Sequence, residues 1–330
     1  MKKGVLLINL GSPDSTDVQD VKKYLREFLM DPLVLDSPYL VRKFVVEGAI
    51  LPKRPADSAE AYKKIWWEEG SPLIVLSKRL QKKLQEKLEI PVALGMRYQN
   101  PSIKSALQEL HDKGVTEVLA IPLYPQYTMS STETVVVKTN EVQKKYFKNM
   151  NLTFLNSFYN RADYIKILAE DIQQKLPKEF DVLLFSYHGI PERHDAKAVK
   201  KSKKHPEMNI KTYRDQCFET TELVREALDL PKDKVKVSFQ SRLGKDPWIK
   251  PYTDYVLNDF PKQGVKNIAV VAPAFVSDCL ETLEEIAMGY EELFMENGGE
   301  KYTYISCLND SNAWVDVLVK WSEGWAKQEN

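Results

Sequence analysis

The sequence has few cysteines. Its three, Cys217, Cys279 and Cys307, lie far apart, and none belongs to a CxxC or zinc-type spacing. Three cysteines cannot complete a disulfide framework, so a reducing, cytoplasmic setting is expected. They also exclude a four-cysteine iron–sulfur cluster within one chain, because such a cluster needs one more thiolate. We therefore expect no prosthetic group of that kind.

An excess of either charge is also missing. Lys and Arg together number 47, Asp and Glu together number 47, and the formal net charge is zero. Such a chain has no long-range basic field, so no nucleic-acid partner is expected. No apolar run reaches the ~18 residues of a transmembrane helix. The apolar start, residues 1–10, leads into a Gly-Ser-Pro turn without a signal-peptide cleavage site, which favours a buried strand.

Common catalytic signatures are absent as well. The chain has neither the Gly-x-Ser-x-Gly elbow of a serine hydrolase nor a Walker A motif. Gly11 follows a predicted strand but lacks the later glycines of a dinucleotide-binding fingerprint. Hydrolase and nucleotide-binding functions of these common types are therefore disfavoured.

Short apolar runs alternate with long amphipathic stretches along the chain. This alternation is typical of βαβ units, so we expect an α/β fold with parallel sheets flanked by helices. The predicted strands are 5–10, 92–95, 118–122, 182–186, 235–239 and 268–272. The predicted helices are 16–29, 76–88, 103–113, 161–175, 217–228 and 280–296.

The second half of the chain repeats the plan of the first. Residues 5–13 (VLLINLGSP) parallel residues 182–191 (VLLFSYHGIP). A Gly-Val pair precedes an apolar run that ends in proline both at 114–122 and at 264–273. The repeat favours a duplicated domain over two unrelated α/β domains with a similar alternation of strands and helices.

The repeat also sets the expected domain boundaries. We expect an N-terminal domain over 1–156 and a C-terminal domain over 157–310. Residues 311–330 carry tryptophans at helical spacing and are expected to pack back on the body as a helix. Ligands of parallel sheets bind beyond the carboxyl ends of the strands, so the site is expected in a cleft between the two halves.

Two segments stand outside this plan. Residues 29–55 mix Leu, Val, Tyr39 and Phe44 with only scattered charges. This composition suits either an apolar lip that touches a membrane surface or a helical hairpin packed on its own domain. Residues 192–212 form a lysine-rich insertion, which we interpret as a mobile, solvated segment rather than a phosphate-binding site.

The chain has only four histidines. His111 lies in a polar helical stretch, and His194 and His205 lie in the lysine-rich insertion, so these three are expected to be solvated. His188 instead follows an apolar strand and precedes Gly189, which permits a tight turn. This position places one imidazole at the end of a strand, where both a structural and a functional role are open.

Three carboxylates follow the last predicted strand of the repeat. Asp278, Glu281 and Glu285 have the i, i+3, i+7 spacing of one helical face, with Asp278 as a plausible N-cap. Acidic residues also favour helix N-termini for electrostatic reasons alone. Together with His188, however, these carboxylates could hold a divalent transition metal or relay protons.

Aromatic residues gather in other segments near the strand ends. Several are expected to be core residues, but a crevice lined with rings and containing one arginine would suit a large, flat, acidic ligand. The aromatic residues concerned are Tyr62, Trp66, Trp67, Tyr98, Tyr124, Tyr127 and Trp248.

Eight short segments, in order along nearly the whole chain, resemble the successive signatures of the ferrochelatase family. One such motif would be weak, but eight in register are specific. They are NLGSP at 9–13, FLMDP at 28–32, GSPL at 70–73, MRY at 96–98, PLYPQY at 122–127, SYHGIP at 186–191, Trp248 with Pro251, and DCLETLEE at 278–285.

The resemblance implies two similar Rossmann-like domains with a porphyrin cleft between them, and insertion of Fe2+ into protoporphyrin IX to give protohaem. It implies that His188 and Glu281 form the catalytic, metal-handling pair, while Asp278 and Glu285 extend a path for protons or metal. The 29–55 lip would admit an apolar substrate from the inner membrane, to which a cytoplasmic protein could attach peripherally. The residues implied to line the porphyrin pocket are Leu10, Tyr62, Arg97, Tyr98, Tyr127 and Trp248.

The sequence departs from the family pattern at two places. Residues 211–213 (KTY) stand where a Gly-Asp-Pro-Tyr turn is expected, and Ala287 and Gly289 shorten the acidic path. Alternatives that stay open are coproporphyrin as substrate, cobalt or nickel as metal, a non-catalytic porphyrin or haem carrier, and a periplasmic-type metal receptor. A monomer and a homodimer are both compatible with the sequence.

Overall fold

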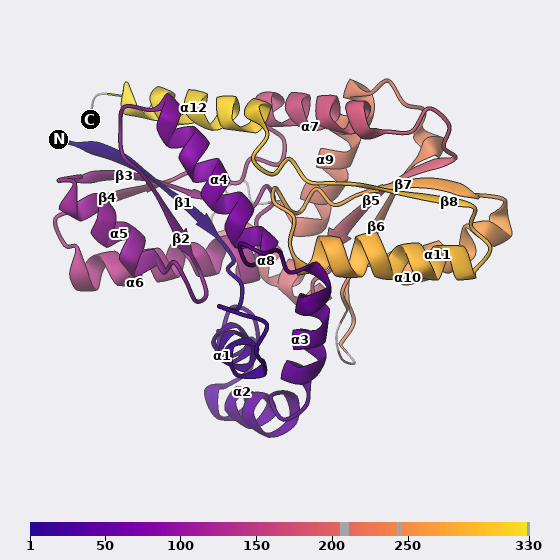
Figure 1. The fold of residues 1–330 in the computed structure, drawn as a ribbon, viewed down its shortest axis with the longest axis horizontal. Coiled ribbons are helices and arrows are strands. Elements are labelled where there is room, and N and C mark those ends of the chain that lie inside the picture. Colours follow the sequence, from indigo (N-terminus) through magenta and orange to yellow (C-terminus); the bar gives the residue numbers. More distant parts are fainter. Residues whose placement is uncertain (205–210, 243, 245, 329–330) are drawn as a thin grey trace. The chain divides into compact units, whose positions relative to one another are not determined.

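The computed structural model describes residues 1–204, 211–242, 244 and 246–328. The chain forms two compact units, each built on a four-stranded parallel sheet (Figure 1). The predicted α/β class, with two parallel sheets flanked by helices, is confirmed. The first unit comprises residues 1–124, 129–157 and 309–330, and the second comprises residues 125–128 and 158–308.

The sheet of the first unit has the strand order β2-β1-β3-β4. Its strands are β1 (Lys3–Asn9), β2 (Val92–Met96), β3 (Glu117–Pro122) and β4 (Asn151–Phe154). The three strands β1, β2 and β3 are buried almost throughout, which explains their continuous apolar runs. Edge strand β4 is half exposed and alternates in character, so it lacks the apolar run that predicted the other three.

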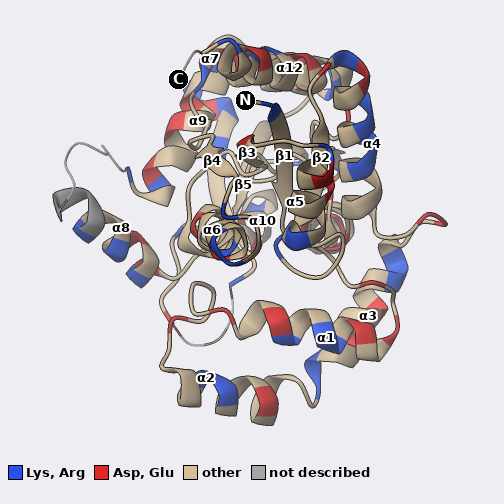
Figure 2. Ribbon diagram, turned by 90° about the vertical axis from the view of Figure 1, so that its left-hand side faces the viewer, with Lys and Arg blue, Asp and Glu red and all other residues tan. Residues whose placement is uncertain are grey.

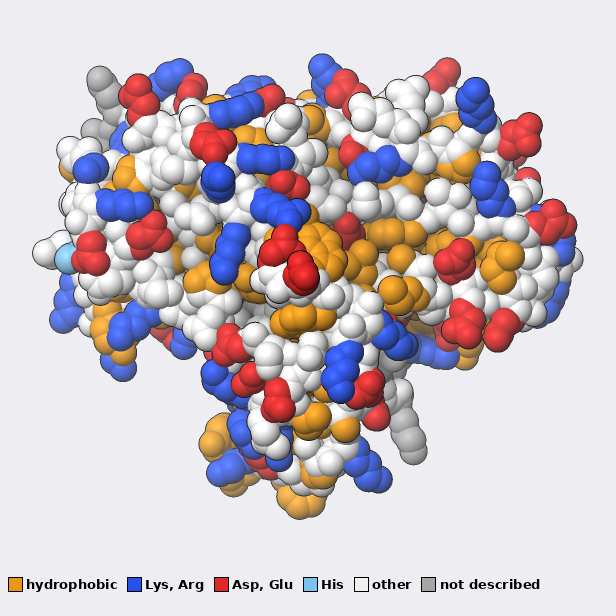
Figure 3. Space-filling view, in the orientation of Figure 1, with side chains coloured by type: hydrophobic (Ala, Val, Ile, Leu, Met, Phe, Trp, Pro, Cys, Tyr) orange, Lys and Arg blue, Asp and Glu red, His pale blue; other side chains and the backbone are white. Residues whose placement is uncertain are grey.

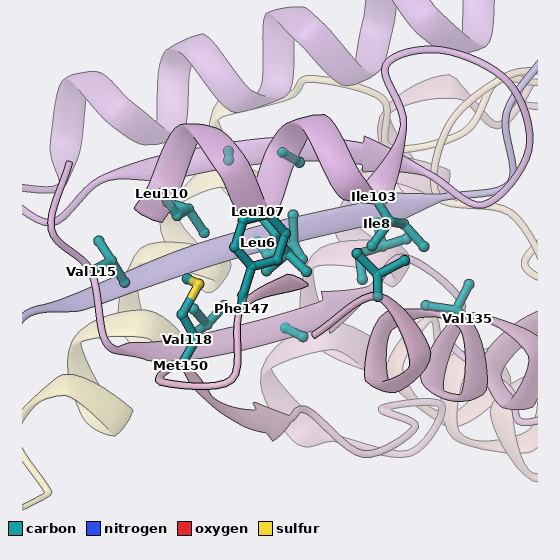
Figure 4. Packing of buried hydrophobic residues seen from close by; sticks show 14 of the residues in the cluster. Leu6, Ile8, Ile103, Leu107, Leu110, Val115, Val118, Val135, Phe147 and Met150 are labelled. Carbon is teal, nitrogen blue, oxygen red and sulfur yellow. The ribbon is translucent and has the colours of Figure 1, made fainter. Parts of the chain in front are cut away.

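Helices of the first unit pack on both faces of this sheet. In one layer, Leu107 of α5, Leu6 of β1 and Phe147 belong to a single buried cluster (Figure 4). Helix α12 packs against α4, where Lys83 forms an ion pair with Asp310. The helices are α1 (Val18–Leu29), α2 (Tyr39–Phe44), α3 (Arg54–Ile65), α4 (Pro72–Lys87), α5 (Ile103–Asp112), α6 (Thr134–Tyr146) and α12 (Asn312–Ala326), with π-helical segments η1 (Val45–Ile50) and η2 (Met129–Glu133).

The sheet of the second unit has the order β6-β5-β7-β8, the same plan as the first. This agreement is what a duplicated domain predicts. Its strands are β5 (Val182–His188), β6 (Val235–Gln240), β7 (Asn267–Val271) and β8 (Lys301–Ile305). Its helical segments are α7 (Ala162–Lys175), α8 (Glu192–Lys204), α9 (Tyr213–Ala227), α10 (Thr253–Asp259), η6 (Glu281–Gly289) and α11 (Tyr290–Glu296), with short 3-10 turns at Lys232–Lys234 and Pro261–Gln263.

The described part of the lysine-rich insertion is largely exposed, as predicted, but it is helical and its first turn is partly buried. Residues 192–204 form helix α8, which carries basic positions in its first part (Figure 2). His194 in its first turn is buried rather than solvated. This turn follows β5 closely, and Asp195 accepts a hydrogen bond from the N–H of Tyr213, which holds the start of α8 against α9. His205 lies outside the described residues, whereas His111 is exposed as predicted.

The helix predicted over 280–296 is divided into two types. Residues 281–289 are π-helical, and an α-helix continues from Tyr290. The helix starts after Asp278, which does not serve as the N-cap. Instead, Asp278 accepts hydrogen bonds from Thr282 and Tyr304, so it links the first turn of η6 to strand β8.

The segment over 29–55 contains α2 and η1, and several of its apolar side chains are open to solvent among charged ones (Figure 3). Val46 and Leu51 are buried, so the segment packs on its own domain in part while other apolar side chains stay exposed, and both alternatives stay open. Among the described residues, no helix combines the length and the apolar character needed to cross a bilayer. The exposed side chains are Tyr39, Leu40, Val41, Phe44 and Val45, each between 38% and 77% accessible.

Candidate functional site

His188 is the last residue of β5, at the carboxyl end of the second sheet. Its backbone carbonyl accepts a hydrogen bond from the Tyr213 hydroxyl at 2.9 Å, which fixes the strand end. The ring meets Phe275 edge-on, with centroids 6.2 Å apart. The Nδ1 atom is buried and has no hydrogen-bond partner among the described residues. A buried nitrogen left without a partner is a natural place for a ligand.

Gly189 brings the Trp248 loop against the end of β5. A Cβ atom at this position would lie 2.7 Å from the Gln240 carbonyl oxygen and 3.1 Å from Cε3 of Trp248. The Gly189 N–H donates to that same carbonyl at 2.9 Å. Only glycine permits this approach, so Trp248 lies directly beside the residue that follows His188.

Glu285 lies in η6 and is held by three donors. It accepts hydrogen bonds from the Ser241 hydroxyl, from the Tyr290 hydroxyl at 2.9 Å and from the Gln240 amide at 3.5 Å. Ser241 adopts a left-handed backbone conformation with φ of 64°, which is uncommon for a non-glycine residue. This conformation places its hydroxyl on the carboxylate.

Burial raises the pKa of Glu285 above its ordinary value of 4.5. The hydrogen bond from Ser241, the charge that His188 can carry and the hydrogen bond from Tyr290 oppose this rise, while the negative charge of Glu281 adds to it. These electrostatic influences show that His188, Glu281 and Glu285 share one neighbourhood. A carboxyl whose pKa is raised in this way can accept and release a proton closer to neutral pH.

Glu281 begins the π-helical segment, four residues before Glu285. A π-helix has i→i+5 hydrogen bonds and a wider turn than an α-helix, so residues four or five apart fall near the same side. Cys279 lies close enough for the Glu281 carboxylate to raise the pKa of its thiol, after burial as the main cause. The buried thiol therefore stays protonated beside Glu281.

Asp278 has a separate set of partners. Its Oδ1 accepts from the Tyr304 hydroxyl at 2.6 Å, from Thr282 at 3.0 Å and from the Cys307 N–H at 3.4 Å. Its charge helps to raise the pKa of Asp171 on α7, although burial of Asp171 is the larger cause. Asp278 thus belongs to the β8 and α7 side of η6, whereas Glu285 belongs to the Ser241 side.

The described residues contain no group of three or more His, Cys, Asp and Glu side chains placed to enclose a metal ion. His188 and its neighbouring carboxylates therefore make at most an open site. A site with so few protein ligands leaves coordination positions of the metal free, which suits an ion that is transferred to a substrate better than one that is bound permanently.

In the first unit, the ends of β1 and β2 bring together three of the residues implied to bind porphyrin. The N–H of Arg97 donates to the Asn9 carbonyl at 2.8 Å, and the N–H of Tyr98 donates to the Leu10 carbonyl at 2.9 Å. Gly11 has φ of +106°, and a Cβ there would lie 2.0 Å from the Tyr98 carbonyl oxygen. Glycine is therefore required where the two motifs meet.

Asp31 anchors Arg97 and Tyr98, a role that the sequence alone does not indicate. It pairs with the Arg97 guanidinium and accepts hydrogen bonds from the hydroxyls of Tyr98 and Thr134. Burial opposes ionisation of Asp31, but the hydrogen bonds from Thr134 and from the Leu33 N–H, together with the Arg97 charge, lower its pKa below 3.8. Tyr98 is fully buried, and its ring supports Arg97 at 4.3 Å.

A cavity of about 690 Å³ opens beside this group in the first unit. Its wall combines Arg97 and Asp31 with Lys43 and Tyr39 of α2 and with Val137 of α6. Its volume lies within the usual range for small-molecule sites. The cavity therefore connects the Arg97 cluster with the exposed apolar segment.

The remaining predicted lining residues lie apart from this cavity's wall. Tyr62 is buried in α3 and packs edge-on against Tyr24, with centroids 6.5 Å apart. Tyr127 is half-buried in the second unit, where its N–H donates to the Gln216 side chain at 2.8 Å. Leu10 packs against the buried cluster of the first sheet. Their roles toward porphyrin stay predictions.

Comparison with solved structures shows the same fold. SirB from Bacillus subtilis with Fe3+ aligns over 99% of this chain and 98% of its own, with a TM-score of 0.58 and 12% identity. The sirohydrochlorin chelatase SirB from Bacillus subtilis subspecies spizizenii in complex with cobalt aligns with a TM-score of 0.57 and 10% identity, over 99% and 98% of the two chains. At such low identity these matches bear on the fold alone.

Comparison of sequences reaches the family. The family model described as Ferrochelatase matches residues 2–324. Proteins named ferrochelatase are 43% identical in Pseudomonas putida (97% of this chain, 98% of theirs), and 45% identical in Pseudomonas aeruginosa (97% and 97%). Another from Pseudomonas fluorescens is 45% identical over 95% of both chains. The resemblance drawn from the eight motifs is confirmed, and this chain belongs to the ferrochelatase family.

Proposed function

We propose that this chain inserts Fe2+ into protoporphyrin IX, with His188 and Glu281 handling the metal and the pyrrole protons. The observation that carries the proposal is the unpartnered, buried Nδ1 of His188 beside the carboxylates of η6. Metal insertion replaces two pyrrole protons by one cation, so the site must present a metal donor and a proton acceptor together. An imidazole and a carboxylate supply both.

The open character of this pair supports transfer. Two protein donors leave most coordination positions of Fe2+ free for porphyrin nitrogens, and the ion can leave the protein with the macrocycle. Glu285 would take protons onward, since its raised pKa allows it to bind a proton transiently. Asp278 would extend the path on the far side of η6.

In the first unit, Arg97 would provide one contact to the porphyrin. Arg97, held by Asp31 and Tyr98, offers a fixed guanidinium to a porphyrin carboxylate. Leu10, Tyr62, Tyr127 and Trp248 would contact the ring, and binding at such remote contacts could bend the macrocycle toward the metal. Because Tyr98 is fully buried, it would act chiefly by supporting Arg97.

We also propose that the exposed face of α2 and η1 contacts a membrane surface peripherally. Large apolar side chains such as Leu40 and Phe44 are rarely left open to water without a partner, and Lys43 lies next to them in α2. The cavity that contains Arg97 begins at this segment, so an apolar substrate could enter from the lipid.

The proposal is tested by anaerobic incubation of the full chain with Fe2+ and either protoporphyrin or coproporphyrin, followed by absorption spectroscopy. Catalysed formation of the iron product supports the chelatase, and the faster porphyrin names the substrate. Faster insertion into coproporphyrin would make coproporphyrin, and not protoporphyrin, the proposed substrate. Tight porphyrin binding without any metal insertion would contradict the proposal and favour a carrier.

A further inference from the structure

A second cavity lies in the second unit, and neither His188 nor any residue of η6 lines it. It has a volume of about 570 Å³ and is bordered by α10, the start of α9 and the segment that enters α10. None of the residues assigned above to metal or porphyrin lines it. Its wall consists of Arg214, Lys250, Pro251, Tyr252, Tyr255, Val256, Asp259, Phe260 and Gln263.

Aromatic rings form much of this wall. Tyr252 and Tyr255 stand edge to face, with centroids 5.6 Å apart. The Arg242 guanidinium lies 4.7 Å from one ring centroid and 4.5 Å from the other, and it donates to the Tyr255 hydroxyl at 3.1 Å. These contacts hold the Tyr255 ring in place although the residue is exposed. A rigid, accessible ring is a ready stacking surface for a flat ligand.

Two of the positively charged side chains that line the cavity have no ion-pair partner within the described residues, whereas the neighbouring acidic side chains are paired. Asp254 is paired with Arg242, and Asp259 is paired with Lys262 at 3.2 Å. Neither Arg214 nor Lys250 forms an ion pair with a carboxylate in the part of the chain that the structure describes. Each lies instead by an aromatic ring, Arg214 near Phe218 at 5.6 Å and Lys250 near Tyr252 at 5.7 Å. Two cations are therefore left without an ion pair among the residues described, although the charge of Arg214 also acts on the Asp195 carboxylate.

We infer that this cavity binds a small aromatic anion, a flat ring that carries a phosphate or a carboxylate. The ring would lie on Tyr255 and the neighbouring Val256 and Phe260, and the anionic group would meet Arg214 and Lys250. The volume is in the range of small-molecule sites, and the combination of aromatic wall and unpaired cations matches that chemistry. The Tyr252 hydroxyl donates to the Trp248 carbonyl at 3.2 Å, so the occupied site would border the Trp248 loop.

The test is calorimetric titration of the full chain with adenosine monophosphate and with 2-naphthoate. Adenosine and inorganic phosphate serve as matched ligands that lack the anionic group or the ring. We expect at least one of the two aromatic anions to bind about tenfold more tightly than either matched ligand. Tighter binding of adenosine monophosphate would identify phosphate as the anionic group, and tighter binding of 2-naphthoate would identify carboxylate. Failure of both aromatic anions to bind more tightly would overturn the inference.

Variants locate the binding. Arg214→Glu and Lys250→Glu are expected to weaken the preferred ligand about tenfold or more, and Tyr255→Ala is expected to weaken it by loss of stacking. Lys236→Glu, at an exposed lysine of β6 outside the cavity, should bind as the unaltered chain does. Unchanged affinity in both charge-reversal variants would place the ligand elsewhere and contradict the assignment. Iron insertion by the same variants reports separately on the proposed chelatase activity.

Discussion

The Tyr290 hydroxyl donates a hydrogen bond to Glu285 Oε1 at 2.9 Å from a position five residues further along the chain. The π-helical conformation of η6 makes this contact possible, because its wider turn brings residues five apart to the same side. In an α-helix the corresponding neighbours are three or four residues apart. The carboxylate thus has a partner within its own helical segment.

Tyr290→Phe should shift the pH dependence of iron insertion toward higher pH. The Tyr290 hydrogen bond lowers the pKa of Glu285, so its removal raises that pKa further, and the ionised proton acceptor then forms only at higher pH. The measurement is the insertion rate as a function of pH. Tyr302→Phe is the matched control, because the Tyr302 hydroxyl donates to the backbone of η6 at Ile286 and not to Glu285. Equal profiles for the two variants would contradict the role of Tyr290.

Glu285→Gln should make thermal stability less dependent on pH. The raised pKa of Glu285 means that its stabilising contribution is complete below pH 4.5 and is lost as the pH rises through the higher, folded-state pKa. The amide variant has no such loss, so its Tm relative to the unaltered chain should increase from acidic to neutral pH. Glu291→Gln, at an exposed position, should show no comparable trend. Calorimetry at several pH values measures the difference, and a constant difference would contradict the assignment.

Gly189→Ala should destabilise the fold by about 1–3 kcal/mol and reduce insertion, because the added Cβ would meet the Gln240 carbonyl oxygen at 2.7 Å. The backbone next to His188 must then shift. Gly324→Ala provides the opposite case, since nothing lies within 4 Å of its Cβ and alanine favours the interior of α12. Urea unfolding of both variants measures the change in the free energy of unfolding. We expect Gly189→Ala to lower it and Gly324→Ala to raise it or leave it unchanged, and a loss of the same size in both variants would contradict this expectation.

Asp31→Asn should cost about 3 kcal/mol at neutral pH, because it leaves the guanidinium of Arg97 without its buried counter-ion. The pKa of Asp31 is lowered, so its contribution is present above pH 3.8 and is lost as the pH falls below that value. The deficit of the variant should therefore shrink in acid. Asp14→Asn, which affects a more exposed ion pair with Lys23, should cost far less. Equal costs at neutral pH would contradict the anchoring role.

Leu40→Glu and Phe44→Glu should reduce flotation of the chain with phospholipid vesicles. Both residues are 77% exposed on α2, so the substitutions remove apolar contact with lipid without opening a core. Tyr146→Glu changes an exposed aromatic residue of α6 and is expected to float as before. Vesicle binding that is equal in all variants would rule out this face as the point of attachment.

Most of the sheets could be predicted because buried parallel strands have continuous apolar sequences. Strands β1 and β5 were located within a few residues on this basis. Edge strands β4 and β8 were missed, since partial exposure removes the apolar run. Helix α6 was missed too, because the threonines and valines of its first half have low helix propensity.

The candidate site was predicted in its titratable residues but not in the residues that position them. His188 and Glu285 could be found because a histidine at a strand end and spaced carboxylates are visible in sequence. Ser241 and Tyr290 could not, because one depends on a left-handed backbone and the other on π-helical spacing. Asp31 lies within a recognised motif, yet only the folded chain brings it to Arg97.

The role of His188 is tested by the rate of anaerobic Fe2+ insertion by His188→Ala, with His111→Ala as the control on the exposed surface of α5. Porphyrin binding is measured in parallel by absorption. We expect His188→Ala to bind porphyrin but to insert iron at least about 100-fold more slowly, while His111→Ala is unaffected. Insertion by His188→Ala at the rate of the unaltered chain would contradict this role.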